Sequence, residues 1–112
     1  MVDPVFTTVY SHPMFTLIES GVFKAWFNGL RDPKARARID ARIKRAQGGN
    51  LGDWKNVVGP INEMRIDYGP GYRLYFARRG AAVIMLLCGG NKGTQQVDIR
   101  QAARILAHFV ED

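Results

Sequence analysis

Hydrophobic and polar side chains alternate through the middle of the chain. Residues 61–68 and 72–78 place apolar side chains at alternate positions, whereas residues 83–88 are apolar throughout. Alternation is typical of a strand with one buried face, and a short unbroken apolar run is typical of a central strand covered on both faces. Turn sequences at 69–71 and 79–80 connect the three segments. The pattern therefore predicts a three-stranded antiparallel meander.

Ahead of this sheet, the apolar positions repeat with the period of a helix. Phe23, Trp26, Phe27 and Leu30 stand three or four residues apart, as on one face of a helix. Ser20 precedes them and is a suitable N-cap, because its hydroxyl oxygen can accept a hydrogen bond from a free backbone N–H of the first turn. A first helix is therefore predicted to begin directly after Ser20.

A second helix is predicted over residues 33–47. Asp32 is a suitable N-cap, Pro33 fits the first helical position, and the glycines of residues 48–50 fit its end. Two helices joined by so short a turn are expected to form a helical hairpin. Arginine and lysine cover most of the second helix, and its narrow apolar face consists of Ala35, Ile39, Ile43 and Ala46.

The remaining segments have weaker patterns. Residues 1–13 are interpreted either as an N-terminal extension or as an edge strand over 5–10, because that stretch is rich in β-branched and aromatic residues. Residues 14–18 predict a second short strand. Residues 51–59 predict a loop with room for a short strand at its end. The glycine-rich residues 89–93 predict a flexible loop that leaves the sheet.

A terminal helix of about 12 residues is predicted to follow this loop. Asp98 and Gln101 have the spacing of a capping box, which places the start of the helix at Asp98. One apolar stripe then runs to the end of the chain: Ile99, Ala102, Ala103, Leu106, Phe109 and Val110. In order along the chain, these elements predict an α+β fold with helices packed on one face of a mostly antiparallel sheet.

This arrangement predicts which side chains the sheet leaves uncovered. If the helical hairpin covers the even-numbered apolar positions of the two alternating strands, then Glu63, Arg65, Arg73 and Tyr75 lie together on the opposite, more open face. We interpret residues 14–112 as a single domain, because 112 residues can bury one modest core.

Composition narrows the classes of function. The net charge is +6 and the isoelectric point is about 9.9, a balance that favours a polyanion or an acidic protein as the partner. Cys88 is the single cysteine, so no internal disulfide and no cysteine-based zinc site can form, and it falls in an apolar run that suggests an inert core position. That run is far too short to span a membrane, and the N-terminus lacks the layout of a signal peptide. We expect a cytoplasmic protein without a metal or cofactor.

Short motifs spaced through residues 14–108 carry a resemblance to a known group of proteins. They are Phe23-Lys24-Ala25-Trp26, Leu30-Arg31-Asp32, the helix Ala35–Arg45, Gly49-Asn50-Leu51-Gly52-Asp53, Glu63-Met64-Arg65-Ile66, Gly69-Pro70-Gly71-Tyr72-Arg73-Leu74-Tyr75, Leu86-Leu87-Cys88-Gly89-Gly90-Asn91-Lys92, Gln95, Asp98-Ile99 and Ala102. With this order of elements, the chain resembles the RelE/ParE superfamily of toxins from bacterial type II toxin–antitoxin systems, and within it the HigB-like addiction module killer proteins.

The resemblance implies a function, partners and a site. Many such toxins bind the ribosome and cut mRNA there without a metal, and each is neutralised by a cognate antitoxin, which in the HigB-like branch usually has a helix-turn-helix domain. The phosphate-holding arginine of these nucleases corresponds to Arg73, and the cation after the last strand corresponds to Lys92. Arg65 and Lys55 correspond to further basic residues.

The proton acceptor has no clear counterpart. Family members often place a tyrosine or histidine near the start of the last helix, and residues 95–99 contain neither. Glu63 is the remaining candidate for a general base, with a salt bridge to a neighbouring arginine as the alternative interpretation. Tyr75 is a candidate for stacking on an unpaired base. The basic face of the second helix is a candidate for contacts with RNA phosphates, through Arg38, Arg42 and Arg45.

Two other functions fit the same pattern. ParE-type relatives poison DNA gyrase by binding, without RNA chemistry, and the missing tyrosine or histidine favours this alternative. A relative that retains only antitoxin binding is the third. Each candidate residue also has a structural explanation: Arg73 can pair across the sheet with Glu63 or Asp67, and Arg65, Lys55 and Lys92 can be ordinary surface cations.

Overall fold

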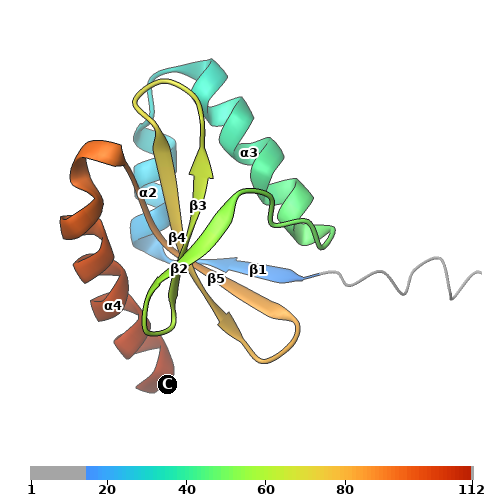
Figure 1. The fold of residues 1–112 in the computed structure, drawn as a ribbon, viewed down its shortest axis with the longest axis vertical. Coiled ribbons are helices and arrows are strands. Elements are labelled where there is room, and N and C mark those ends of the chain that lie inside the picture. The colour runs from blue at the N-terminus through green and yellow to red at the C-terminus, as the bar shows by residue number, and fades with distance from the viewer. Residues whose placement is uncertain (1–14, 112) are drawn as a thin grey trace, which may run out of the picture.

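A five-stranded sheet in the order β1-β5-β4-β3-β2 organises residues 15–111, the part of the chain that the computed structural model describes (Figure 1). The predicted extension 1–13 and its edge strand lie outside these residues. The strands are β1 (Thr16–Glu19), β2 (Trp54–Val58), β3 (Ile61–Ile66), β4 (Tyr72–Arg79) and β5 (Val83–Asn91).

The predicted meander is confirmed as β3, β4 and β5, which pair antiparallel in chain order. The short strand predicted over residues 14–18 is confirmed as β1, which begins two residues later, pairs parallel with β5 and forms one edge of the sheet. β2 pairs antiparallel with β3 and forms the other edge, so the short strand allowed at the end of residues 51–59 is present and takes up most of that segment. Its sequence, WKNVV, is strongly β-forming, but it is too short and too exposed to show an alternating pattern.

The two predicted helices are confirmed as α2 (Gly21–Gly29) and α3 (Pro33–Gln47). The Ser20 hydroxyl accepts a hydrogen bond from the Phe23 N–H at 2.9 Å and donates one to the Leu87 carbonyl at 2.6 Å, so the cap of α2 is tied to β5. The Asp32 carboxylate accepts a hydrogen bond from the Lys34 N–H at 2.9 Å at the start of α3.

The expectation that helices cover only one face of the sheet is wrong, because α4 (Gln95–Glu111) covers the other face. Figure 1 shows α4 on one side of the strands and α3 on the other. One core cluster joins α2 and α3 to Met64, Leu74 and other even-numbered side chains of the sheet. A second joins α4 to Tyr75 and Met85. Both faces of β4 and β5 carry apolar side chains, and burying the second set requires a cover of its own.

The C-terminal segment departs most from the sequence-based prediction. The glycines expected in a flexible loop continue β5 to Asn91, a 3₁₀ turn η1 (Lys92–Thr94) follows, and α4 then begins at Gln95 with 17 residues. Asp98 lies inside the first turn of α4, so its expected role as the N-cap is wrong. Asn91 caps η1 instead by accepting a hydrogen bond from the Gly93 N–H at 2.8 Å.

Close packing explains why glycines occupy the end of β5. A Cβ atom at Gly89 would lie 2.6 Å from Cδ2 of Trp26, and one at Gly90 would lie 2.7 Å from the carboxyl carbon of Asp98. Real Cβ atoms do not approach other atoms so closely, so α2 and the start of α4 can pack against β5 at these positions only because no side chain is present there.

Candidate functional site

An open groove of about 370 Å³ brings together three of the four predicted catalytic residues, Arg65, Arg73 and Lys92. Arg65 lies on β3, Arg73 lies on β4, and Lys92 begins η1 directly after β5. The ends of three strands that neighbour one another in the sheet therefore supply one cation each. The full lining is Asp53, Arg65, Ile66, Asp67, Gly71, Arg73 and Lys92.

Arg65 and Arg73 stand directly opposite each other in the β3–β4 pair. Like charges in this position repel, so the arrangement costs stability unless negative charge lies between or beside them. Arg65 has one partner, Asp53, at 3.0 Å between NH2 and Oδ1. Arg73 has another, Glu63, at 3.4 Å between Nε and Oε1.

These partners do not satisfy both guanidinium groups. The Nε atoms of Arg65 and Arg73 are buried, and neither has a hydrogen-bond partner within residues 15–111. The Arg73–Glu63 contact is close enough for an ion pair but lacks the geometry of a hydrogen bond. Buried polar atoms without partners are rare in folded proteins. The buried Nε atoms cannot reach a ligand, but NH2 of Arg73 has no partner among residues 15–111, and Lys92 lines the same groove. The groove thus has the positive charge to bind an anion such as a phosphate group.

Gly71 places Arg73 beside Lys92. Its φ of +80° lies in the left-handed region, which favours glycine. A Cβ atom built there would lie 3.4 Å from Cβ of Lys92 and 3.6 Å from NH1 of Arg73. The turn between β3 and β4 therefore sets the two cations on either side of a position with no side chain.

Glu63 does not face the groove as a general base would. Its side chain is only 1% exposed, so its expected place on an open face is wrong. Both carboxylate oxygens lie 3.4 Å from Nε2 of Gln95 on α4, and Oε1 contacts Arg73. Because α4 covers this face, Glu63 holds the arginine from beneath.

Tyr75 and Arg42 were also expected on the surface, and both are buried. Tyr75 is fully covered by α4, and burial raises the pKa of its hydroxyl, so it is not available to stack on a base. Arg42 donates hydrogen bonds to the carbonyl groups of Leu51, Asp53 and Arg65 at 2.9, 3.1 and 2.6 Å. Its guanidinium group thereby fixes the loop before β2 and places Asp53 beside Arg65.

The other predicted RNA-binding residues stay on the surface outside the groove. Lys55 is exposed on the edge strand β2, opposite Glu63 in the pairing, and does not line the groove. Arg38 and Arg45 are exposed on α3 and line a neighbouring cleft.

Sequence reasoning named Asp67 only as a possible partner of Arg73 and gave Asp53 no role, yet both carboxylates line the groove. Asp53 comes from the loop fixed by Arg42, and Asp67 directly follows β3. Asp67 has no ion pair and no side-chain hydrogen bond within the described range 15–111. The one available signal was position: Asp67 follows Arg65 on the same side of the strand.

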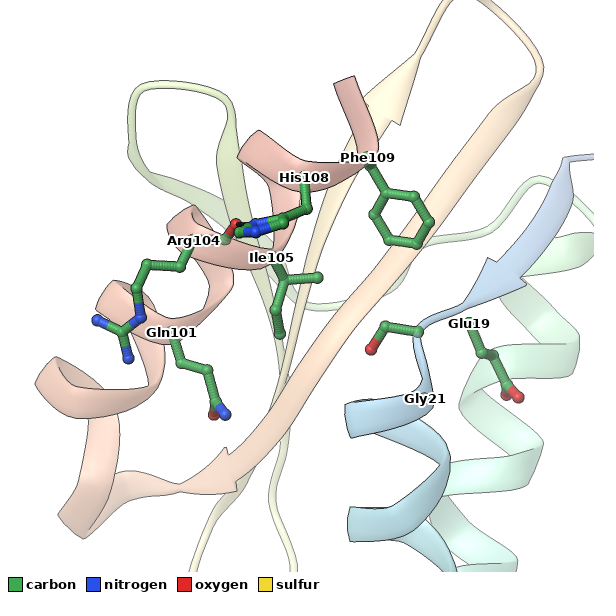
Figure 2. A pocket seen from close by; sticks show the side chains of 8 residues that line it. Glu19, Gly21, Gln101, Arg104, Ile105, His108 and Phe109 are labelled. Atoms are coloured by element: carbon green, nitrogen blue, oxygen red, sulfur yellow. Dashed lines mark hydrogen bonds between the residues drawn. The ribbon is translucent and has the colours of Figure 1, made fainter. Parts of the chain in front are cut away.

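A second cavity, of about 530 Å³, lies between α4 and the corner where β1 meets α2 (Figure 2). Ile105 and Phe109 point into it, while Gln101, Arg104 and His108 lie along its α4 wall. His108 is exposed, and its Nδ1 lies 2.9 Å from the Arg104 carbonyl oxygen. His108 does not line the groove.

Residues 15–111 contain no group of three or more His, Cys, Asp or Glu side chains placed to hold a metal ion. None of the helices described there has the length and apolar character needed to span a bilayer.

Comparisons with known proteins identify relatives of the chain. Residues 25–109 match the family described as Phage derived protein Gp49-like. A protein of Haemophilus influenzae described as uncharacterized is 50% identical over 80 residues, which cover 71% of this chain and 81% of that protein. The family match includes α3, the whole groove and most of α4.

Proposed function

Because the chain belongs to the Gp49-like family of phage-derived proteins, which is toxin-like and related to addiction module toxins, we propose that it is the toxin of a toxin–antitoxin pair and cuts mRNA on the ribosome. The observation that carries this proposal is the opposed pair of arginines, Arg65 and Arg73, which line one groove together with Lys92. Two cations held face to face at the rim of a groove are suited to an anionic ligand.

The chemistry that this groove supports is transfer of a phosphoryl group within the RNA chain. The 2′ oxygen of one nucleotide forms a bond to the phosphorus as its proton passes to an acceptor. The bond to the 5′ oxygen of the next nucleotide breaks, and that oxygen takes up a proton from the protonated acceptor or from water. Arg73, Arg65 and Lys92 would hold the phosphate and stabilise the negative charge that grows on its oxygens. No metal is needed for either task.

The proton of the 2′ hydroxyl needs an acceptor, and Glu63 is too deeply buried to reach it. Asp53 is engaged by Arg65, which leaves Asp67 as the carboxylate of the groove that is free to act. We propose Asp67 for this role, with a group of the ribosome as the alternative. Replacement by asparagine tests it, because D67N should bind RNA at least as tightly as the parent protein and slow cleavage.

The decisive test of the proposal is a cleavage assay with ribosomes programmed with mRNA. The parent protein should produce new 5′ ends within codons, and R73K should reduce their yield at least tenfold, since an ammonium group cannot form the two parallel hydrogen bonds of a guanidinium. R100A is the matched control, because Arg100 is exposed on α4 away from the groove. Intact mRNA with the parent protein, in cells whose growth it arrests, would refute the nuclease.

Poisoning of DNA gyrase is the second candidate function. One observation favours it: the lining of the groove, all of it within the described residues, includes no histidine or tyrosine to exchange protons with a substrate. A supercoiling assay with purified gyrase separates the two. Inhibition of supercoiling without RNA cleavage would replace the first proposal with the second.

We also propose a cognate antitoxin as the partner, with a helix-turn-helix domain and an acidic segment that covers part of this basic surface. The net charge of +6 supports an acidic partner. Co-expression with the product of the neighbouring reading frame should restore growth, and the two proteins should purify together. Growth arrest that persists despite a stable complex would refute neutralisation.

A further inference from the structure

We propose that the groove continues past Asp67 into a second phosphate-binding cleft on α3, so that one single-stranded RNA segment is held by at least two of its phosphates. The inference rests on the proposed function for the identity of the polyanion. That the two clefts together bind a polyanion is inferred from their shape and charge.

The two clefts share a wall. The second, of about 390 Å³, is lined by Arg38, Ala41, Arg42, Arg45, Ile66 and Asp67. Ile66 and Asp67 also line the groove that holds Arg73 and Lys92. A chain that lies in the groove can therefore pass over the end of β3 and enter the space between β3 and α3. Ile66 itself is a buried core residue, so the charged side chain on this shared wall is that of Asp67.

Two cations of the second cleft are free for a ligand. The guanidinium group of Arg42 donates hydrogen bonds to three backbone carbonyls, so the cations left to bind a ligand are Arg38 and Arg45. Burial, and after it the charge of Arg45, lowers the pKa of Arg42. The positive charge of Arg45 thus repels that of Arg42. A phosphate in the cleft would relieve this repulsion.

Arg38 is also held in place. Its guanidinium carbon lies 4.6 Å from the centre of the Tyr68 ring, and the Tyr68 hydroxyl donates a hydrogen bond to Asp32 at 2.9 Å. The ring is thus fixed by the cap of α3, and it fixes the arginine in turn. Planar groups of this kind also accept a stacked nucleobase, a property that favours RNA over an acidic peptide as the occupant.

Asp67 stands at the junction as the one acidic side chain on the shared wall. Its charge opposes a polyanion that crosses from one cleft to the other. The structure therefore predicts changes of opposite sign at neighbouring positions: removing Arg38 and Arg45 weakens binding, whereas removing the charge of Asp67 strengthens it. A change in net charge alone predicts the same signs, so the discriminating comparison is with arginines outside the clefts, whose removal changes the net charge equally.

The test measures binding without cleavage. A fluorescent oligouridine whose 2′ oxygens are all methylated cannot be cut, so its affinity reports the clefts alone. We would measure it between about 50 and 200 mM salt, where single-stranded binding changes with a slope of about 0.7 per neutralised phosphate. R38Q/R45Q should weaken binding and reduce the slope by about 1.4, two contacts at that value. R100Q/R104Q, two exposed arginines of α4, is the matched control and should leave the slope unchanged.

Two further measurements complete the test. D67N should bind the oligouridine more tightly than the parent protein does. Uridine 3′-monophosphate, which has one phosphate, should bind R38Q/R45Q as well as it binds the parent protein, because it needs only the first groove. Equal losses of oligouridine affinity in R38Q/R45Q and R100Q/R104Q would overturn the inference. It would also be overturned if polyglutamate bound instead of the oligouridine and its binding depended on Arg38 and Arg45 in the same way.

The two proposals can fail separately. If mRNA stays intact but the methylated oligouridine shows the predicted dependence on Arg38, Arg45 and Asp67, the nuclease is refuted and the second cleft stands. If mRNA is cut and the affinity for the oligouridine does not depend on these residues, the nuclease stands and the second cleft is refuted.

Discussion

Replacing Glu63 with glutamine tests whether a buried carboxylate anchors the central arginine. The change keeps the shape of the side chain and its contact with Gln95, and it removes the charge that lies 3.4 Å from Nε of Arg73. At an effective dielectric constant of about 20, this separation corresponds to a direct attraction of about 5 kcal/mol. Removing one partner of a buried ion pair costs about 3–5 kcal/mol in practice. Because the Arg73 side chain is still 12% exposed, we expect the lower end, about 3 kcal/mol.

Urea denaturation measures this loss. With a slope of about 2 kcal/mol per molar urea, a loss of about 3 kcal/mol lowers the midpoint by about 1.5 M. The cycle of E63Q, R73Q and the double variant should give a coupling energy of about 2 kcal/mol, since the double variant leaves no unpaired charge in the interior. E19Q is the control, because Glu19 is exposed on β1 and should change stability by less than about 0.5 kcal/mol. An E63Q protein as stable as E19Q would refute the anchoring role.

The same variant separates an anchor from a general base. If Glu63 positions Arg73, E63Q should weaken binding of the methylated oligouridine together with cleavage, because the phosphate-holding group is displaced. If Glu63 accepted the proton, E63Q should lower the rate of cleavage and leave oligouridine binding unchanged.

Three other predictions concern the frame of the site. R42A should lower the free energy of unfolding by about 3 kcal/mol, because Arg42 donates hydrogen bonds to three carbonyl groups, whereas R45A should change it by less than about 0.5 kcal/mol. Thermal unfolding compares the two variants, and equal melting temperatures would contradict this structural role of Arg42. G90A should cost about 1–3 kcal/mol as its methyl group meets the first turn of α4, whereas G29A, with open space around it, should cost nothing by the same assay. Burial raises the pKa of Cys88 to about 12, so the thiol should resist iodoacetamide at mildly alkaline pH until urea unfolds the chain; labelling of the folded protein would contradict its core position.

The parts of the fold that the sequence predicted correctly are those with local causes. Ser20 and Asp32 cap helices because their side chains reach backbone groups two or three residues away. The alternation over residues 61–78 assigns each side chain to a face of the sheet, and those assignments are confirmed: Leu74 and Phe76 lie in one core cluster and Tyr75 in the other. Such signals need no knowledge of distant segments.

The errors concern what covers each face, which depends on distant segments. The sequence places Tyr75 and Glu63 opposite the helical hairpin, but it does not show that α4 returns over that face. Arginine is rarely buried, so a basic helix suggests that Arg42 is exposed, and only the tertiary structure brings three carbonyl groups within its reach. The glycines of β5 predict a loop when only the local sequence is considered. The atoms that exclude a Cβ at these positions belong to α2 and α4, which are distant in the sequence.

The two arginines of the groove are held differently, and this ranks them as ligands for a phosphate. Glu63 contacts Arg73 through Nε, from beneath, which leaves NH2 of that guanidinium without a partner in the described part of the chain. Asp53 contacts Arg65 through NH2 at the surface, where the Asp53 side chain is 60% exposed, so an arriving phosphate must compete with it. A cation that is already oriented and need not break an ion pair stabilises developing charge with less reorganisation. Arg73 should therefore contribute more to binding and catalysis than Arg65, even though Arg65 is the more exposed of the two.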